Sequence, residues 1–159
     1  MEVTYIDQQL NHPKRVCLDN TAGPTAVTIS RGESLGYDMT KDNLGYVTKM
    51  NATAALNRLF AGISRKSMVI AAGQKGFLEI DEPGSITEAL VLDGAVDGVA
   101  EYSTLKWKYH ATKGGVLSES AGAVGCGAAV LLEAVGAANP AVVQLKRVYL
   151  DTGNRQISA

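Results

Sequence analysis

The stretch that decides the fold is Leu59–Gly84, LFAGISRKSMVIAAGQKGFLEIDEPG. It runs from an apolar strand through a small-residue turn into a second strand, in which Leu78 and Ile80 share one face and their neighbours share the other. Pro83-Gly84 then ends the strand, as this dipeptide commonly does in turns. Short strands separated by glycine-marked turns are typical of an all-β protein.

A looser form of the same phrase lies at Val124–Leu150, VGCGAAVLLEAVGAANPAVVQLKRVYL. Its alanines would allow a helix, but glycines at positions 122, 125 and 127 would each cost about 0.8–1.0 kcal/mol in a helix interior. We therefore predict a strand, a turn and a second strand. This last strand changes its apolar phase at Lys146-Arg147, which predicts a β-bulge.

The clearest alternation lies in Leu105–His110, LKWKYH, where an apolar face of Leu, Trp and Tyr alternates with a polar face. Lys113-Gly114-Gly115 then turns the chain into Val116-Leu117, so the two segments predict a β-hairpin. The apolar segments on either side of Asp93-Gly94 predict a second hairpin.

Weaker patterns predict short strands at Val16–Leu18, Val27–Ile29 and Leu44–Thr48. Asn51–Leu59 is expected to form either a short helix or a loop. Together the patterns predict an all-β fold of about eight to ten short antiparallel strands, arranged as a β-sandwich or small barrel.

The chain divides by composition into three segments. Residues 1–25 are polar, interrupted by prolines, and predict an extended N-terminal arm. Residues 26–150 carry the strand patterns and predict the β-sandwich or barrel domain, and residues 151–159 form a polar C-terminal tail.

Size and charge limit the classes of function. A chain of 159 residues is long enough for one core, and 15 basic against 16 acidic residues leave a net charge of -1 without a cluster of Lys or Arg. We therefore expect no nucleic acid and no membrane among its partners. The N-terminus lacks the apolar block of a signal peptide, which predicts a protein that stays in the cytoplasm of the cell that makes it.

Metal and cofactor sites have weak support. The spacing of the cysteines and histidines matches no zinc-binding pattern, and a four-ligand site would need Cys17, Cys126, His12 and His110 together. Asp81, Glu82 and Glu88 could suggest a calcium site, but they surround a turn and are expected to be solvated. We expect no metal and no cofactor.

One stretch matches a catalytic motif. GESLG at Gly32–Gly36 has the G-x-S-x-G pattern of a nucleophile elbow, and Asp93 or Asp97 followed by His110 gives the chain order of a hydrolase triad around Ser34. The motif needs a strand-to-helix turn, whereas the residues after the second glycine disfavour a helix. We predict a turn serine and no enzyme activity, with a small serine hydrolase as the less favoured alternative.

The aromatic stripe of Trp107 and Tyr109 allows two interpretations. Core packing is the commoner role for such a stripe, but tryptophan is also a favoured interface anchor. The two residues are therefore candidates for a trimer or surface contact. In a tail or fibre protein they would instead contact a host glycan, which is the second alternative function.

Three phrases carry a resemblance to a known family. They are RGESLGY at Arg31–Tyr37, the stretch from Phe60 to Ile80 with its Ala72-Gly73 turn, and the stretch from Val124 to Leu145 with its Gly136-Ala137 turn. Over residues 26–150 these phrases resemble the small β-rich head decoration, or cement, proteins of tailed bacteriophages.

The resemblance implies a β-sandwich or barrel, usually a homotrimer, on the outer surface of an icosahedral head. Its partners would be the major capsid protein and other copies of itself, and its role would be to clamp neighbouring capsid subunits against the pressure of packaged DNA. It would reside in the host cytoplasm during assembly and in the virion afterwards. The residues expected to contact the capsid from the arm are Tyr5, Ile6, Leu10, His12, Pro13 and Arg15.

Overall fold

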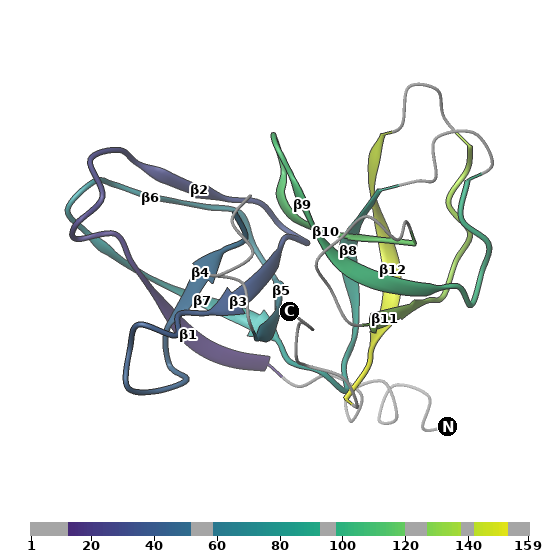
Figure 1. The fold of residues 1–159 in the computed structure, drawn as a ribbon, viewed down its shortest axis with the longest axis horizontal. Helices are drawn as coiled ribbons and strands as arrows, with labels where there is room; N and C mark the ends of the chain where they lie inside the picture. Colours follow the sequence, from purple (N-terminus) through teal and green to yellow (C-terminus); the bar gives the residue numbers. More distant parts are fainter. Residues whose placement is uncertain (1–12, 52–58, 93–97, 120–126, 138–141, 153–159) are drawn as a thin grey trace, which may run out of the picture.

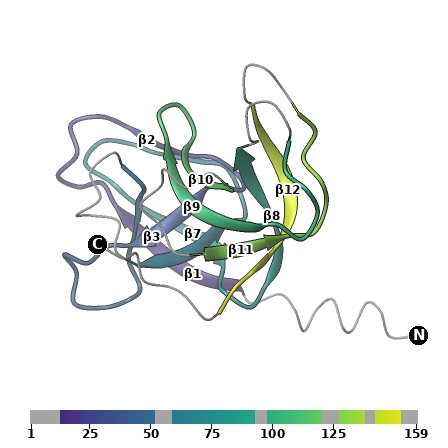
Figure 2. The same ribbon diagram turned by 45° about the vertical axis from the view of Figure 1, so that its right-hand side comes forward.

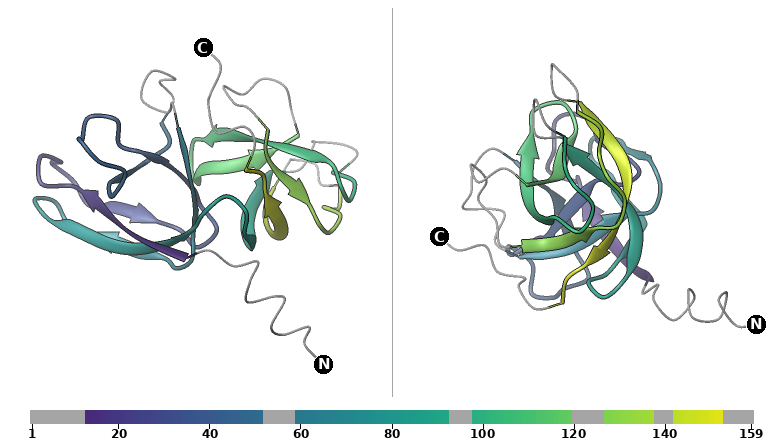
Figure 3. Two further views of the ribbon diagram at one scale, coloured as in Figure 1. Left: turned by 90° about the horizontal axis from the view of Figure 1, so that it is seen from below. Right: turned by 90° about the vertical axis from the view of Figure 1, so that its right-hand side faces the viewer.

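The computed structural model describes residues 13–51, 59–92, 98–119, 127–137 and 142–152. These residues form twelve strands and no helix, and nearly all pairings are antiparallel, which confirms the predicted all-β class (Figure 1). Within the same ranges there is accordingly no helix that could cross a membrane. The strands gather into two bodies, one formed before residue 82 and one after residue 85 (Figures 1 and 3).

The first body is a five-stranded sheet with a two-stranded ribbon. The sheet has the order β1-β7-β5-β3-β4, and the ribbon pairs β2 with β6. A bridge from Cys17 to Tyr46 brings the two edges of the sheet together, and the Cys17 N–H donates to Gly45 O at 2.8 Å. The strands are β1 (Pro13–Asp19), β2 (Val27–Ile29), β3 (Ser34–Tyr37), β4 (Val47–Lys49), β5 (Phe60–Ser64), β6 (Met68–Ile70) and β7 (Lys75–Asp81).

The second body is a closed barrel of five strands in the order β10-β8-β12-β11-β9 (Figure 2). It closes because β8 pairs with β12 on one side and, in parallel, with β10 on the other. A closed barrel leaves no free strand edge. Its strands are β8 (Ile86–Leu92), β9 (Thr104–His110), β10 (Gly114–Ser118), β11 (Gly127–Leu131) and β12 (Val143–Leu150).

The two bodies share part of one hydrophobic core. The first body has its own cluster, which includes Val16, Ile29, Leu35 and Ile80. The core of the second body contains residues of the barrel together with three from the first body: Met50, Phe60 and Ile63.

Trp107 of β9 lies in this shared core and is fully buried. Its ring packs edge-on against Phe60 of β5, with centroids 5.7 Å apart and planes at 68°. A Cβ at Gly36 would lie 2.6 Å from the Trp107 ring, so the absence of a side chain at Gly36 makes room for the indole. A backbone hydrogen bond also joins the bodies, from Leu90 N–H to Gly32 O at 2.8 Å.

Several strand predictions are confirmed. The β9–β10 hairpin is confirmed, since Gly114 pairs with His110 and Leu117 with Trp107, but its turn lies at residues 111–113, and Gly114 and Gly115 already belong to β10. In β7, Leu78 and Ile80 are buried while Phe77 and Glu79 are exposed, as the alternation predicted. The helix or loop expected at Asn51–Leu59 falls mostly on residues 52–58, outside the described residues.

The arm predicted over residues 1–25 is wrong for its second half. Pro13–Asp19 forms β1, which pairs with β7 along seven residues and buries Val16, Cys17 and Leu18. The short strand predicted at Val16–Leu18 is thus confirmed, and it extends over Pro13–Asp19 because β7, about 60 residues later in the chain, pairs with it along its whole length. Residues 1–12 lie outside the described part of the chain.

Two local predictions are also wrong. The hairpin expected at Asp93-Gly94 is not formed by the described residues, because β12 and β10 occupy both edges of β8 and Val99 bridges Val135; residues 93–97 themselves lie outside the described part of the chain. The bulge expected at Lys146-Arg147 is absent, since β12 keeps one register with β8 from Val143 to Tyr149. The apolar phase changes because Leu145 points outward and lies against Gly32 of the first body.

The close approach at the junction yields a stability prediction. A Cβ at Gly115 of β10 would collide with the backbone oxygen of Ser34 and lie 2.9 Å from Trp107 Nε1. We expect Gly115→Ala to lower the free energy of unfolding by about 1–3 kcal/mol, because neither backbone can move without opening the junction. Urea unfolding followed by the fluorescence of the single tryptophan measures the change.

Gly136→Ala is the matched control, because a Cβ at Gly136 has no neighbour within 4 Å. We expect this variant to unfold at the wild-type urea concentration or slightly above it. Equal stability of Gly115→Ala and Gly136→Ala would contradict the close packing of β10 on β3.

Candidate functional site

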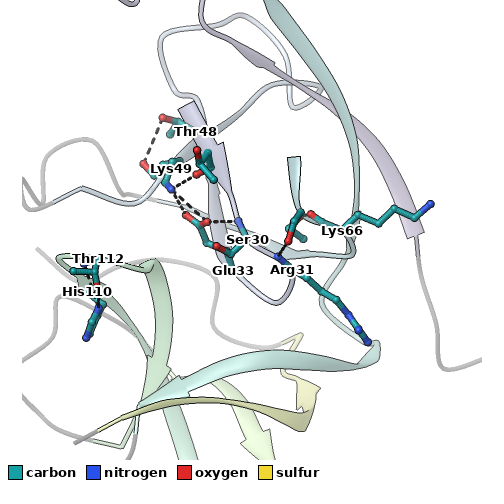
Figure 4. Close-up of polar contacts among 11 residues, drawn as sticks. Ser30, Arg31, Glu33, Thr48, Lys49, Lys66, His110 and Thr112 are labelled. Atoms are coloured by element: carbon teal, nitrogen blue, oxygen red, sulfur yellow. Dashed lines mark hydrogen bonds and ion pairs between the residues drawn. The ribbon is translucent and has the colours of Figure 1, made fainter. Parts of the chain in front are cut away.

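Ser34 does not occupy a nucleophile elbow. It lies in β3, a strand of an antiparallel sheet, and its residue is fully buried. His110 is half-buried at the end of β9, where its ring contacts Thr112 (Figure 4). Asp93 and Asp97 lie outside the described residues, and no hydrogen bond joins Ser34 to His110 in the part that is described.

The two aromatic residues proposed as surface contacts differ in exposure. Trp107 is completely buried in the shared core, so it cannot be a surface, trimer or glycan contact of the folded chain. Tyr109 lies two residues further along β9 and is 37% exposed. Only Tyr109 remains available for contact with another molecule.

The structure describes only two of the six residues that were expected to contact a capsid. Tyr5, Ile6, Leu10 and His12 lie outside the described residues. Pro13 and Arg15 lie at the start of β1 and are exposed. Arg15 pairs with Glu79 in register, and so faces the same side of the sheet as the outward residues of β7.

A groove lies on this outer side of the sheet. We call it the Arg15–Phe77 groove; it encloses about 350 Å³ and is lined by Arg15, Lys66, Met68, Phe77, Leu78 and Glu79. The Phe77 ring is 56% exposed, and the Arg15 guanidinium lies over it at 5.2 Å from the ring centroid. Exposed aromatic surface beside cationic side chains is a common composition of interaction sites.

A larger cleft of about 540 Å³ lies where the two bodies meet. Its charges are largely compensated, because Arg31 pairs with Glu88 and Arg65 lies 3.7 Å from both Glu79 and Asp81. Asp81 is buried and accepts a hydrogen bond from Thr87 Oγ1 at 2.7 Å, so the prediction that it is a solvated turn acid is wrong. The carboxylate helps to hold the connection between β7 and β8.

A second buried carboxylate lies at the same junction. Glu33 is fully buried, and Lys49 Nζ lies 3.1 Å from its Oε1 (Figure 4). The Ser30 N–H donates to Oε2 at 2.9 Å, and a Cβ at Gly114 of the second body would collide with this carboxylate. Glu33 therefore fills the junction between the first body and β10.

Burial raises the pKa of the Glu33 carboxyl, and the Ser30 N–H, the Lys49 ammonium and the Gly115 N–H only partly oppose this effect. The folded protein thus holds the Glu33 proton more tightly than the unfolded chain does. This contribution to stability is fully present below the ordinary glutamate pKa of about 4.3 and is lost as the pH rises through the raised pKa.

Cysteine and metal chemistry have little basis in the described residues. Cys17 is a free, buried thiol whose pKa is raised by burial. Among the residues that the structure describes, no three His, Cys, Asp or Glu side chains gather as metal ligands do. Cys126 and His12 lie outside that part of the chain.

Comparison with known proteins gives no family. No protein-family model matches the sequence, and no curated protein matches it either. The function is therefore inferred from the residues and their geometry.

The sequence carried one usable signal for these sites. Phe77 stands on the outward face of a strand whose inward face is already apolar, which marks it as exposed aromatic surface. Neither the Glu33–Lys49 pair nor the position of Lys66 and Met68 beside Arg15 has a sequence signature, because each is formed by residues from separate strands or turns.

The pH dependence of the Glu33–Lys49 pair is testable. Lys49→Met removes the ammonium that offsets the burial of Glu33, together with a hydrogen bond to Thr28 O. We expect the variant to lose about 1–3 kcal/mol of unfolding free energy at pH 8 and clearly less at pH 4, where Glu33 is protonated. Urea unfolding at the two pH values measures the difference.

Lys113→Met serves as the control, because Lys113 is exposed in the β9–β10 turn. Its effect should be small and equal at both pH values. The double variant Glu33→Gln/Lys49→Met should lose the extra pH dependence of Lys49→Met. An equal loss for Lys49→Met at pH 4 and pH 8 would show that Glu33 does not titrate as its burial requires.

Proposed function

We propose that this protein is a capsid decoration, or cement, protein that binds the outer surface of an icosahedral phage head as a homotrimer. In this role it would stabilise contacts between major capsid subunits. The proposal gives the protein no catalytic step and no cofactor, because clamping needs contact area and a rigid body.

The proposal rests mainly on apolar side chains that are exposed on the strands of the first body. Phe77 and Val69 belong to β7 and β6 and are 56% and 67% exposed, whereas the next residues along these strands, Leu78 and Ile70, are buried in the core. Apolar side chains held outward on strands are suited to contact with another protein. The resemblance of residues 26–150 to decoration proteins supports the same conclusion.

The arrangement of the two bodies also suits a clamp. The Trp107 contact and the Leu90–Gly32 hydrogen bond hold one body against the other. Surfaces of the two bodies could therefore contact two neighbouring capsid subunits at a fixed spacing. A specific interface buries roughly 1,200–2,000 Å² in total. In a trimer, three such contacts reinforce one another, since the second and third become intramolecular.

The main residues on which the two alternative functions depended are buried in the folded chain. The glycan-binding alternative depended on Trp107, which is buried, and retains only Tyr109. The hydrolase alternative depended on Ser34, which is also buried.

Binding to heads is the direct test. We expect the purified protein to co-sediment saturably with empty heads from a mutant of its phage that lacks it, and to raise the temperature at which these heads disrupt. Sedimentation equilibrium of the free protein should give either one or three times the chain mass, and the bound form should be trimeric. Failure to bind expanded heads at micromolar concentration would refute the proposed function.

The arm is testable without disturbing the fold, because β1 begins at Pro13. We expect deletion of residues 2–12 to leave the urea unfolding curve unchanged and to weaken head binding about tenfold, since Tyr5, Ile6 and Leu10 would no longer contribute apolar contact. Co-sedimentation titration measures the affinity. Wild-type occupancy by the truncated protein would mean that the arm is dispensable.

A further inference from the structure

We propose that the Arg15–Phe77 groove is the surface that docks on the major capsid subunit, and that it receives a segment in which a carboxylate lies beside an apolar side chain. This inference rests on the proposed function and names the face and the chemistry of the contact. Three features of the groove carry it: its apolar floor, its uncompensated cations and its position next to the arm.

The apolar part of the groove is held rigidly. Phe77 lies within β7, which pairs with β1 along seven residues, and Leu78 beside it points into the core. Met68 of β6 packs over the same strand, since a Cβ at Gly76 would lie 3.3 Å from its sulfur. An apolar side chain of a partner would therefore meet a preformed surface, and little conformational entropy would be lost on binding.

The charges of the groove favour an acidic partner. Arg15 and Lys66 have no carboxylate within 4.0 Å among the described residues, whereas Glu79, the acidic residue of the groove, lies 3.7 Å from Arg65 outside it. Arg15 and Lys66 thus line the groove without an ion pair among the described residues, and Lys66 also borders the larger cleft. A carboxylate between them would gain charge-assisted hydrogen bonds and still leave the apolar floor accessible.

The position of the groove makes it continuous with the arm. Arg15 is three residues from His12, the last residue expected to contact the capsid from the arm, and Pro13 lies between them on the exposed start of β1. A capsid subunit that contacts Pro13 would therefore lie two residues from Arg15 of the groove. Tyr109 and Tyr102, the exposed tyrosines of the second body, do not line this groove.

Two sets of variants test the proposal by co-sedimentation with the empty heads. Phe77→Glu places a carboxylate on the apolar floor, and Arg15→Glu/Lys66→Glu reverses both cations; we expect each to weaken head binding about 10- to 30-fold. Raising the NaCl concentration from 50 to 500 mM should weaken wild-type binding and have a smaller effect on the double variant. All the altered side chains are largely exposed, so thermal unfolding should stay near the wild-type temperature.

Met39→Glu is the matched control, because Met39 has the same 56% exposure as Phe77 and lies in the loop after β3. It should bind heads as the wild type does. If wild-type protein binds heads and Phe77→Glu binds equally well, the groove is not the docking face although the proposed function stands. If the wild type does not bind heads, both are wrong.

Two other results would show that something other than a capsid segment binds in the groove. Loss of the trimer in Phe77→Glu, with head binding per chain unchanged, would make the groove a contact between copies of this protein. Residues 1–12 contain Glu2 and Asp7 with several apolar residues, so they are also chemically suited to the groove. A gain in head binding on deletion of residues 2–12 would identify them as the occupant of the free protein and overturn the proposal.

Discussion

The packing of Trp107 against Phe60 is the contact on which the two-body arrangement depends. The indole is fully buried between a strand of the barrel and a strand of the first sheet, and Gly36 leaves the space that it fills. Its Nε1 has no hydrogen-bond partner among the described residues, which costs about 1–3 kcal/mol. The apolar burial around the ring must exceed that cost, so the core of the barrel is incomplete without Phe60, Ile63 and the rest of the first body.

Polar contacts then fix the orientation that the apolar contact leaves free. Hydrophobic packing is not directional, whereas Leu90 N–H to Gly32 O specifies how β8 meets the first body. Gly32 has φ +81°, and a Cβ there would lie 2.5 Å from Leu145. The buried Glu33 carboxylate reaches the start of β10 from the same turn. The short turn at Gly32 and Glu33 thus positions the barrel on the first body. The polar groups of this turn are buried because the barrel covers them.

The sequence predicted the parts of this fold that depend on near neighbours. The alternation in Leu105–His110 and the glycines after it were sufficient to predict that β9 and β10 form a hairpin, although the turn lies at residues 111–113, before the glycines. It predicted a strand at Val16–Leu18 but not the full length of β1 or its pairing with β7, and it could not predict the choice of β12 over the segment after residue 92 as the partner of β8. The outward Leu145 was interpreted as a bulge for the same reason, because its contact with Gly32 joins positions 113 residues apart. Phe77 was correctly placed on the outer face, but the cations beside it come from other elements.

Exposed apolar residues on strands lose less conformational entropy on binding than the same residues on loops would. Ordering a loop costs about 1–2 kcal/mol per residue, and a contact made by a loop must overcome that cost before it stabilises a complex. Phe77 and Arg15 are already ordered by the pairing of β7 with β1, and Arg15 lies over the ring in the free protein. The same residues on a flexible segment would bind more weakly for equal contact area. In the proposed role of a clamp between shell subunits, contacts on a paired strand would relax less than contacts on a loop.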